Sequence, residues 1–275
     1  MNKFVANANI VLNEVAELID NPPQKIDYQG EIKAGVDLGT ANLVLAAVDK
    51  DNKPLLALCE PGTVVRDGLV VDYIGALKIV KKMKIKMEAI FNREIKYAAT
   101  AVPPGTGGRD IDTFKNVVQG AGFTVKNVVD EPSAAATLLG IERGVVVDIG
   151  GGTTGISILE DGKVVYTADE ATGGTHLNLV IAGGLGISIE KAEKIKRDPD
   201  RIDEIFPMVI PVIEKIASII NNHIGKYKAE TVYLVGGTSA IDGIEEVLAK
   251  KTGLKIVKPS QTLLVTPLGI AINCE

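Results

Sequence analysis

The sequence is poor in cysteine and aromatic residues, and it contains no tryptophan. Among its 275 residues there are two cysteines, and aromatic residues make up 4%. Cys59 and Cys274 are too few and too far apart to indicate a disulfide framework, and no C-x-x-C spacing indicates a zinc site. The cysteine usage therefore favours a reducing compartment.

Long hydrophobic runs and a strong basic charge are also missing. No apolar stretch approaches the roughly 18 residues of a membrane-spanning helix, and the N-terminus lacks the pattern of a signal peptide. The formal net charge is −5, with both signs interspersed, whereas proteins that bind nucleic acids carry a basic face. We therefore expect a cytoplasmic protein without membrane or nucleic-acid partners.

Two glycine-rich turns are the most informative positive feature. Each follows an apolar run that ends in aspartate: Gly35–Thr40 contains Asp37, and Val147–Thr154 contains Asp148. Glycines let backbone N–H groups approach phosphate oxygens without obstruction by a Cβ atom, and a carboxylate at a strand end can hold the water shell of Mg²⁺. The pair predicts two halves of one nucleotide site.

The two turns also indicate an internal duplication. Asp37 aligns with Asp148, and Gly39 aligns with Gly150, at a separation of about one domain. A cleft between two lobes is the usual place for a ligand. We predict a helical extension, a first lobe with one turn, a second lobe with the other turn, and a C-terminal segment that returns to the first lobe: residues 1–33, 34–146, 147–261 and 262–275.

Strand and helix patterns alternate in both halves. Lys33–Asp49 and Lys53–Cys59 are rich in β-formers, and Ile156–Leu159 and Lys163–Thr167 flank an Asp-Gly pair typical of a hairpin. Leu177–Lys196 has one helical pattern. The alternation predicts an α/β protein with mixed sheets.

A dinucleotide-binding fold is the first alternative. Gly150, Gly152 and Gly155 satisfy the G-x-G-x-x-G spacing after an apolar strand. That fingerprint requires a helix to begin at the glycines, whereas the sequence after Gly155 continues as a β-hairpin. A glycine-rich hairpin without a ligand would not explain why the same pattern recurs at Asp37.

A third glycine pair, Gly236-Gly237, leaves another apolar strand, and such a turn lets a flat base lie against the backbone. Together with the segments Thr100–Pro104 and Val129–Gly140, the ordered motifs resemble the actin and DnaK-type ATPase superfamily over roughly residues 34–275. The run Val64–Tyr73 is most similar to the EutJ family of ethanolamine-utilisation proteins. The resemblance implies a two-lobed actin-like ATPase fold, built from duplicated ribonuclease-H-like mixed sheets flanked by helices, with reduced upper subdomains.

The resemblance also implies the site residues. Asp37 and Asp148 would hold the hydration shell of Mg²⁺ and serve catalysis with Glu131, which would position the attacking water. Glu131 could instead only satisfy N–H groups at a helix start. The phosphates of ATP would be surrounded by Gly39, Thr40, Gly150, Gly151, Gly152, Thr153, Gly174 and Thr175. The adenosine would be held by Gly236, Gly237, Glu193 and Lys196.

Two departures from the superfamily pattern affect the activity that we expect. Related ATPases commonly carry a second acid after the Gly-Gly-Gly-Thr turn, where this sequence has Gly155. The chaperones have an arginine that stacks on adenine where this sequence has Ala240. Weaker metal positioning and slow hydrolysis, or binding without turnover, are therefore expected.

The resulting hypothesis is an ATP- and Mg²⁺-binding actin-like ATPase that acts on protein partners, as a chaperone-like factor in ethanolamine utilisation. Its partners would include ethanolamine-utilisation or microcompartment proteins. One alternative is a polymerising scaffold of the bacterial actin type. The other is a small-molecule kinase, which we disfavour because the sequence shows no further carboxylate beside Glu131 to act as a base.

Overall fold

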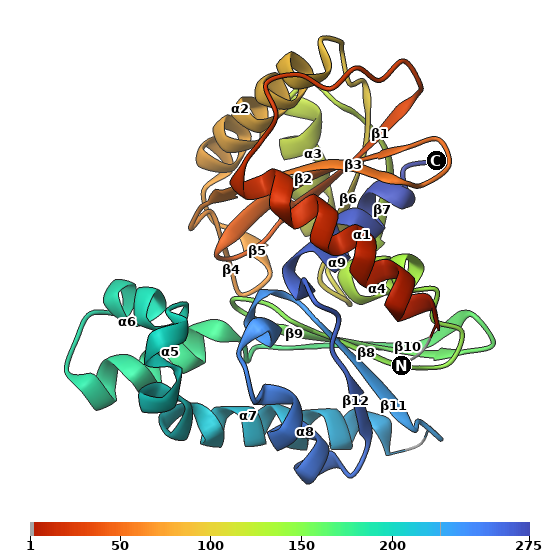
Figure 1. The fold of residues 1–275 in the computed structure, drawn as a ribbon. Helices are drawn as coiled ribbons and strands as arrows, with labels where there is room; N and C mark the ends of the chain where they lie inside the picture. Colours follow the sequence, from red (N-terminus) through yellow and green to blue (C-terminus); the bar gives the residue numbers. More distant parts are fainter. Residues whose placement is uncertain (1–2, 226) are drawn as a thin grey trace.

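The chain forms two mixed sheets of five strands, with helices between them and on their outer faces (Figure 1). The computed structural model describes residues 3–225 and 227–275, so residues 1 and 2 of the predicted extension lie outside it. The predicted α/β class with mixed sheets is confirmed.

The first sheet has the strand order β3-β2-β1-β6-β7. β1 (Ile32–Leu38), β2 (Asn42–Asp49) and β3 (Pro54–Pro61) pair antiparallel, whereas β6 (Tyr97–Val102) and β7 (Thr124–Asp130) continue in parallel. The two β-rich segments of the sequence, Lys33–Asp49 and Lys53–Cys59, correspond to β1 with β2 and to β3. The sheet therefore places the carboxyl end of β1 at its centre, where Asp37 lies.

Two helices and a short hairpin complete this lobe. α2 (Tyr73–Phe91) begins where the Asp72 side chain accepts a hydrogen bond from the Gly75 N–H, and α3 (Gly108–Gly120) lies beside α2. Apolar residues of α2 at helical spacing pack into the core against the sheet. β4 (Val65–Arg66) and β5 (Leu69–Val70) form a separate two-stranded ribbon.

The second sheet repeats this topology in the order β10-β9-β8-β11-β12. Its strands are β8 (Gly144–Ile149), β9 (Thr154–Glu160), β10 (Lys163–Glu170), β11 (Thr231–Val235) and β12 (Lys255–Val257). β8, β9 and β10 pair antiparallel, and β8, β11 and β12 pair in parallel. Because β9 begins directly after the glycines, no helix starts there, and the dinucleotide alternative fails.

The helices α7 (Ile202–Ile224) and α8 (Ile244–Thr252) lie against the outer face of the second sheet, and α5 (Gly174–Leu185) packs against α7 and α6 (Ile189–Lys196) (Figure 1). Two short 3₁₀ turns, η1 (Pro199–Arg201) and η2 (Gly237–Ala240), precede α7 and α8. The predicted single helix over Leu177–Lys196 is wrong. Gly186 has φ +65°, which ends α5, and the Ser188 side chain then caps α6.

Three helices lie between the sheets: α1 (Lys3–Asp20), α4 (Glu131–Leu139) and α9 (Thr262–Ile272) (Figure 1). A Cβ atom on Gly269 of α9 would lie 1.9 Å from the Ala134 carbonyl oxygen of α4, so only glycine allows this close crossing. The N-terminal helix buries Leu12 and Val15 in the same layer. Both lobes therefore share one central core.

The described helices give no sign of a bilayer crossing: within residues 3–225 and 227–275, none combines the length and apolar character needed to span a membrane.

Candidate functional site

The two glycine-rich turns meet between the lobes. A Cβ atom on Gly151 would lie 3.1 Å from the Cβ atom of Thr40, and one on Gly152 would lie 3.0 Å from the Thr40 hydroxyl oxygen. Thr40 follows β1 in the first sheet, and the glycines follow β8 in the second. The structure therefore brings the two predicted turns close together, and an added side chain at either glycine would crowd Thr40.

Three acidic side chains converge beside these turns. Burial, followed by repulsion from Asp148, raises the pKa of Asp37 to about 7. Burial, opposed by a hydrogen bond, raises the pKa of Asp148 to about 6. Burial and the charges of Asp148 and Asp37 raise the pKa of Glu131 well above its usual range. A cation among these groups would relieve both the repulsion and the desolvation.

Asp148 is held in place from two sides. The Thr266 hydroxyl on α9 donates a hydrogen bond of 2.5 Å to one of its carboxylate oxygens. A Cβ atom on Gly236 would lie 2.2 Å from the other oxygen, and Gly236 has φ +90°. The sequence prediction missed Thr266, although a hydroxyl among the apolar residues of the last helix was a visible signal.

The second turn is tied to its own lobe through its carbonyl groups. The Gly150 carbonyl accepts from the Gly174 N–H at 3.0 Å and the Thr238 hydroxyl at 2.8 Å. The Gly151 carbonyl accepts from both the N–H and the hydroxyl of Thr175, at 2.7 and 2.8 Å. Because the C=O and N–H of a trans peptide point in opposite directions, the amides that follow these carbonyls face away from α5.

Glu193 and Lys196 lie at the edge of the same cluster. They form an ion pair of 2.6 Å, and the Lys196 ammonium lies 3.5 Å from the Gly174 carbonyl oxygen. Burial lowers the pKa of Lys196. Burial alone would raise the pKa of Glu193, but Lys196 and hydrogen bonds from Asn178 and Arg197 lower it. The pair is therefore ordered beside the second turn.

A fourth acid, Asp169, was missed by the sequence prediction. The strand registers pair Asp148 with Gly155 and Gly155 with Asp169, so the three residues form one row across β8, β9 and β10. Burial raises the pKa of Asp169 to about 6, against a hydrogen bond from Thr153. Its charge also raises the pKa of Glu131. The expectation that no further carboxylate accompanies Glu131 is therefore wrong.

A sequence signal for this acid was available. The stretch from Asp169 to Thr175 again places an acidic residue at a strand end, followed by two glycines and a threonine. The spacing differs from that at Asp37 and Asp148, because three residues separate Asp169 from Gly173, whereas one residue separates each of the other two acids from its glycine. Asp169 also belongs to a hairpin return strand rather than to one of the aligned turns.

The acids do not form a direct metal cage. Within the described part of the chain, no three His, Cys, Asp or Glu side chains are close enough together to hold a metal ion between them. Mg²⁺ usually keeps several waters and is bound by one or two carboxylates together with substrate phosphates. The donor set, with one buried carboxylate oxygen of Asp169 that lacks a hydrogen-bond partner, therefore fits a hydrated Mg²⁺ ion.

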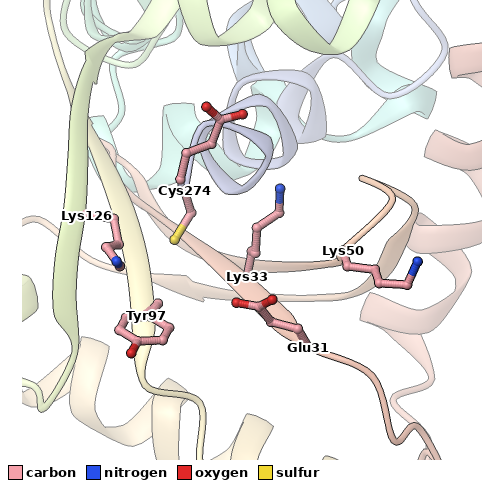
Figure 2. Close-up of a pocket in the computed structure, with 7 residues that line it drawn as sticks. Glu31, Lys33, Lys50, Tyr97, Lys126 and Cys274 are labelled. Atoms are coloured by element: carbon pink, nitrogen blue, oxygen red, sulfur yellow. The ribbon is translucent and has the colours of Figure 1, made fainter.

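Two surface pockets lie away from this site. One, of about 430 Å³, is lined by Glu31, Lys33, Lys50, Tyr97, Lys126, Cys274 and Glu275 at the outer part of the first lobe (Figure 2). The other, of about 390 Å³, lies between α4 and the β9–β10 hairpin. Neither is lined by a residue predicted for nucleotide binding, so both lie outside the candidate site.

Known proteins resemble this chain in sequence and in fold. The family described as type IV pilus assembly protein PilM matches residues 115–268. The ethanolamine utilization protein EutJ of Escherichia coli K12 is 44% identical over 238 residues, which cover 86% of this chain and 84% of that protein. Both matches include the second turn.

Solved structures also resemble this chain. The crystal structure of EutJ from Carboxydothermus hydrogenoformans has a TM-score of 0.92 and 47% identity, with 98% of each chain covered. MreB5 of Spiroplasma citri, solved with AMPPNP, has a TM-score of 0.70 and 18% identity, with 89% of this chain and 96% of that chain covered. The latter shows the fold alone and confirms the predicted actin-like architecture. By sequence and structure, the chain belongs to the EutJ family, within the actin and DnaK-like ATPase superfamily.

Proposed function

We propose that the chain binds Mg²⁺ and ATP between its two turns, hydrolyses the nucleotide slowly, and acts on protein partners in ethanolamine utilisation. The pathway is suggested by the name of the EutJ relatives. The nucleotide is suggested by the AMPPNP in the MreB5 structure of the same fold. A chaperone-like role rests on the resemblance of the Val129–Gly140 segment to the DnaK-type ATPases.

One observation carries this proposal: acids from both lobes share one electrostatic environment beside two glycine turns that lie close together. Asp37 comes from the first sheet, Asp148 comes from the second, and Glu131 begins the helix between them. Besides burial, the charge of Asp148 raises the pKa of Asp37, and the charges of Asp148 and Asp37 raise the pKa of Glu131. Uncompensated acids are costly in a folded protein, so such a group is a functional-site candidate rather than a stabilising feature.

The chain's own groups suit phosphate binding and water activation. With the carbonyls of Gly150 and Gly151 bound to α5, the following amides are free to face phosphate oxygens. Bound Mg²⁺ would neutralise charge on the phosphates and the carboxylates. Glu131, at the first turn of α4, would then orient the attacking water and accept its proton.

Nucleotide entry requires the lobes to separate at the turns. The turns lie so close together that a Cβ atom on Gly151 would be 3.1 Å from the Cβ atom of Thr40, which leaves little room for a phosphate between them. The chain crosses between the lobes at α4 and α9, which pack against each other at Gly269. Opening about this crossing would change the relative position of the lobes and report the nucleotide state to a partner.

Isothermal titration of the protein with Mg-ATP tests the proposal. The wild type should bind one nucleotide per chain, and Asp148→Asn should weaken binding by about tenfold or more, because it removes a charge that holds the metal's water shell. Asp161→Asn is the matched control, since Asp161 lies at the exposed turn of the β9–β10 hairpin. No binding by the wild type, or equal affinity for the wild type and Asp148→Asn, would refute the proposal.

A second experiment addresses the partners. The immobilised chain should retain proteins encoded with the ethanolamine pathway differently in Mg-ATP and in EDTA, because lobe separation changes the exposed surface. Identical bound proteins in both conditions would contradict nucleotide-dependent partner binding, while leaving the titration result intact.

A further inference from the structure

Position 155 lacks the acid that related ATPases carry, and the space around it is narrow. A Cβ atom on Gly155 would lie 3.1 Å from Pro132 and 3.5 Å from Pro104. Pro132 directly follows Glu131 in the first turn of α4. A side chain at position 155 would therefore press on the helix turn that presents Glu131.

Asp169 lies next to this position on the neighbouring strand. Residues paired directly across antiparallel strands project on the same face, and neighbouring strands are about 4.8 Å apart. Asp169 therefore shares the face of Asp148 and occupies the far side of Gly155. The next residue, Glu170, projects on the opposite face, where it contacts His223 of α7.

The contacts of Asp169 indicate a ligand rather than a purely structural role. The Thr153 side chain, at the end of the second turn, hydrogen-bonds the carboxylate. The oxygen Oδ1 is buried, and none of the described groups hydrogen-bonds it. An unpaired buried oxygen destabilises the folded protein. A charged side chain kept in this state points to a partner that binds with the nucleotide.

We propose that Asp169 is the second acid of the second-lobe turn, holding a water of the Mg²⁺ shell in place of the acid that is missing at position 155. This rests on the proposed function and assigns to it a residue outside the glycine motifs. Asp148 and Asp169 then lie on the two strands that flank Gly155, so that both carboxylates face one site. Thr153 connects Asp169 to the turn. Asp169 is a positioning residue that acts through metal-bound water.

The test measures ATP affinity with excess Mg²⁺ and with EDTA, for wild type, Asp169→Asn and Glu170→Gln. In Asp169→Asn, the gain in affinity that Mg²⁺ provides should fall roughly tenfold, as expected for one lost hydrogen bond to a charged group. Affinity for metal-free ATP should stay equal or increase, because one negative charge near the phosphates is gone. Glu170→Gln should match the wild type in both conditions.

The outcomes separate the inference from the proposed function. If the wild type binds ATP in neither condition, the proposed function fails. If the wild type binds and Asp169→Asn loses equal affinity in both conditions, Asp169 is structural and the inference fails alone. Unchanged Mg²⁺ dependence in Asp169→Asn also overturns it. Asp169→Ser is the second variant, used if thermal melting shows that Asp169→Asn does not fold.

Discussion

The two aspartate turns have the same place in their sheets but differ in how firmly they are held. Asp148 accepts a hydrogen bond from Thr266, and its turn is tied to α5 through the carbonyls of Gly150 and Gly151. No described residue hydrogen-bonds the carboxylate of Asp37, whose pKa is raised by burial and by Asp148. The two sheets therefore repeat the same backbone topology, but among the described residues a side-chain hydrogen bond fixes Asp148 and none fixes Asp37.

This difference suggests a division of labour between the lobes. The second lobe holds its turn, the Glu193–Lys196 pair and Asp169 in one ordered cluster. The first lobe contributes Asp37 and Thr40 from a single hairpin. We infer that the second lobe is preorganised for the nucleotide and that the first lobe closes on it.

The largest expected effect comes from substituting the glycine that encloses Asp148. Gly236→Ala forces alanine into φ +90° and brings its Cβ atom within 2.2 Å of the Asp148 carboxylate. The free energy of unfolding should fall by about 3 kcal/mol. Gly39→Ala in the first lobe meets only the Asn42 carbonyl oxygen, at 2.6 Å, and should cost about 1–2 kcal/mol. Urea unfolding of both variants measures the difference, and equal losses would contradict the comparison.

An intermediate effect is expected when the hydroxyl support of Asp148 is removed. Thr266→Val keeps the side-chain shape but leaves Asp148 without its 2.5 Å hydrogen bond, at a cost of about 2 kcal/mol in unfolding free energy. The pKa of Asp148 should rise, because that hydrogen bond lowers it. Thr266→Ser retains the hydroxyl, so it should restore most of the unfolding free energy and most of the lowering of the Asp148 pKa. If Thr266→Val unfolds like the wild type, the second-lobe acid is not better supported than the first.

The smallest expected effect is the difference between the two aspartates in what each contributes to the pH dependence of stability. Both carboxyls have folded pKa values above the usual 3.8, so the folded state binds protons more tightly than the unfolded state. The stability gained by protonation is present at low pH and is lost as pH rises from about 4 to about 7. Melting of the nucleotide-free protein in EDTA should therefore occur at a lower temperature at about pH 7.5 than at about pH 5.

Asparagine variants of the two aspartates show which lobe contributes more to the pH dependence of the melting temperature. Glu131 also contributes to the slope, because its pKa is raised as well. Of the two aspartates, Asp37, whose pKa is about 7, should contribute more above about pH 6 than Asp148, whose pKa is about 6. Asp37→Asn should therefore flatten the profile more than Asp148→Asn. If the two variants flatten the pH profile equally, the two aspartates do not differ in their electrostatic contribution to stability, and this part of the comparison is wrong.

Much of the architecture could be predicted from the sequence because its signals are local. The acid-glycine turns, the Asp161-Gly162 hairpin and the alternating strands and helices each depend on neighbouring residues. The resemblance to the superfamily supplied the arrangement of the two lobes. The break between α5 and α6 was missed because the apolar spacing continues across Gly186, where a left-handed φ ends the helix.

The supports of the site were harder to predict because they depend on contacts between distant segments. Thr266 reaches Asp148 across 118 positions of the sequence. Asp169 becomes a neighbour of Asp148 only through the registers of two strand pairs. Spacing along the chain identifies neither contact, since each requires the packing of α9 or the position of β10. The central turns could be predicted, whereas the residues that hold them could not.

A double-mutant cycle on Mg-ATP affinity tests the central claim most directly, with Asp37→Asn, Asp148→Asn and the combined variant measured by isothermal titration. If both acids hold one water shell, each substitution should weaken binding by about tenfold, and the combined loss should be clearly smaller than the product of the two. Losses that multiply, or an Asp37→Asn variant that binds like the wild type, would contradict a single site shared by the two lobes.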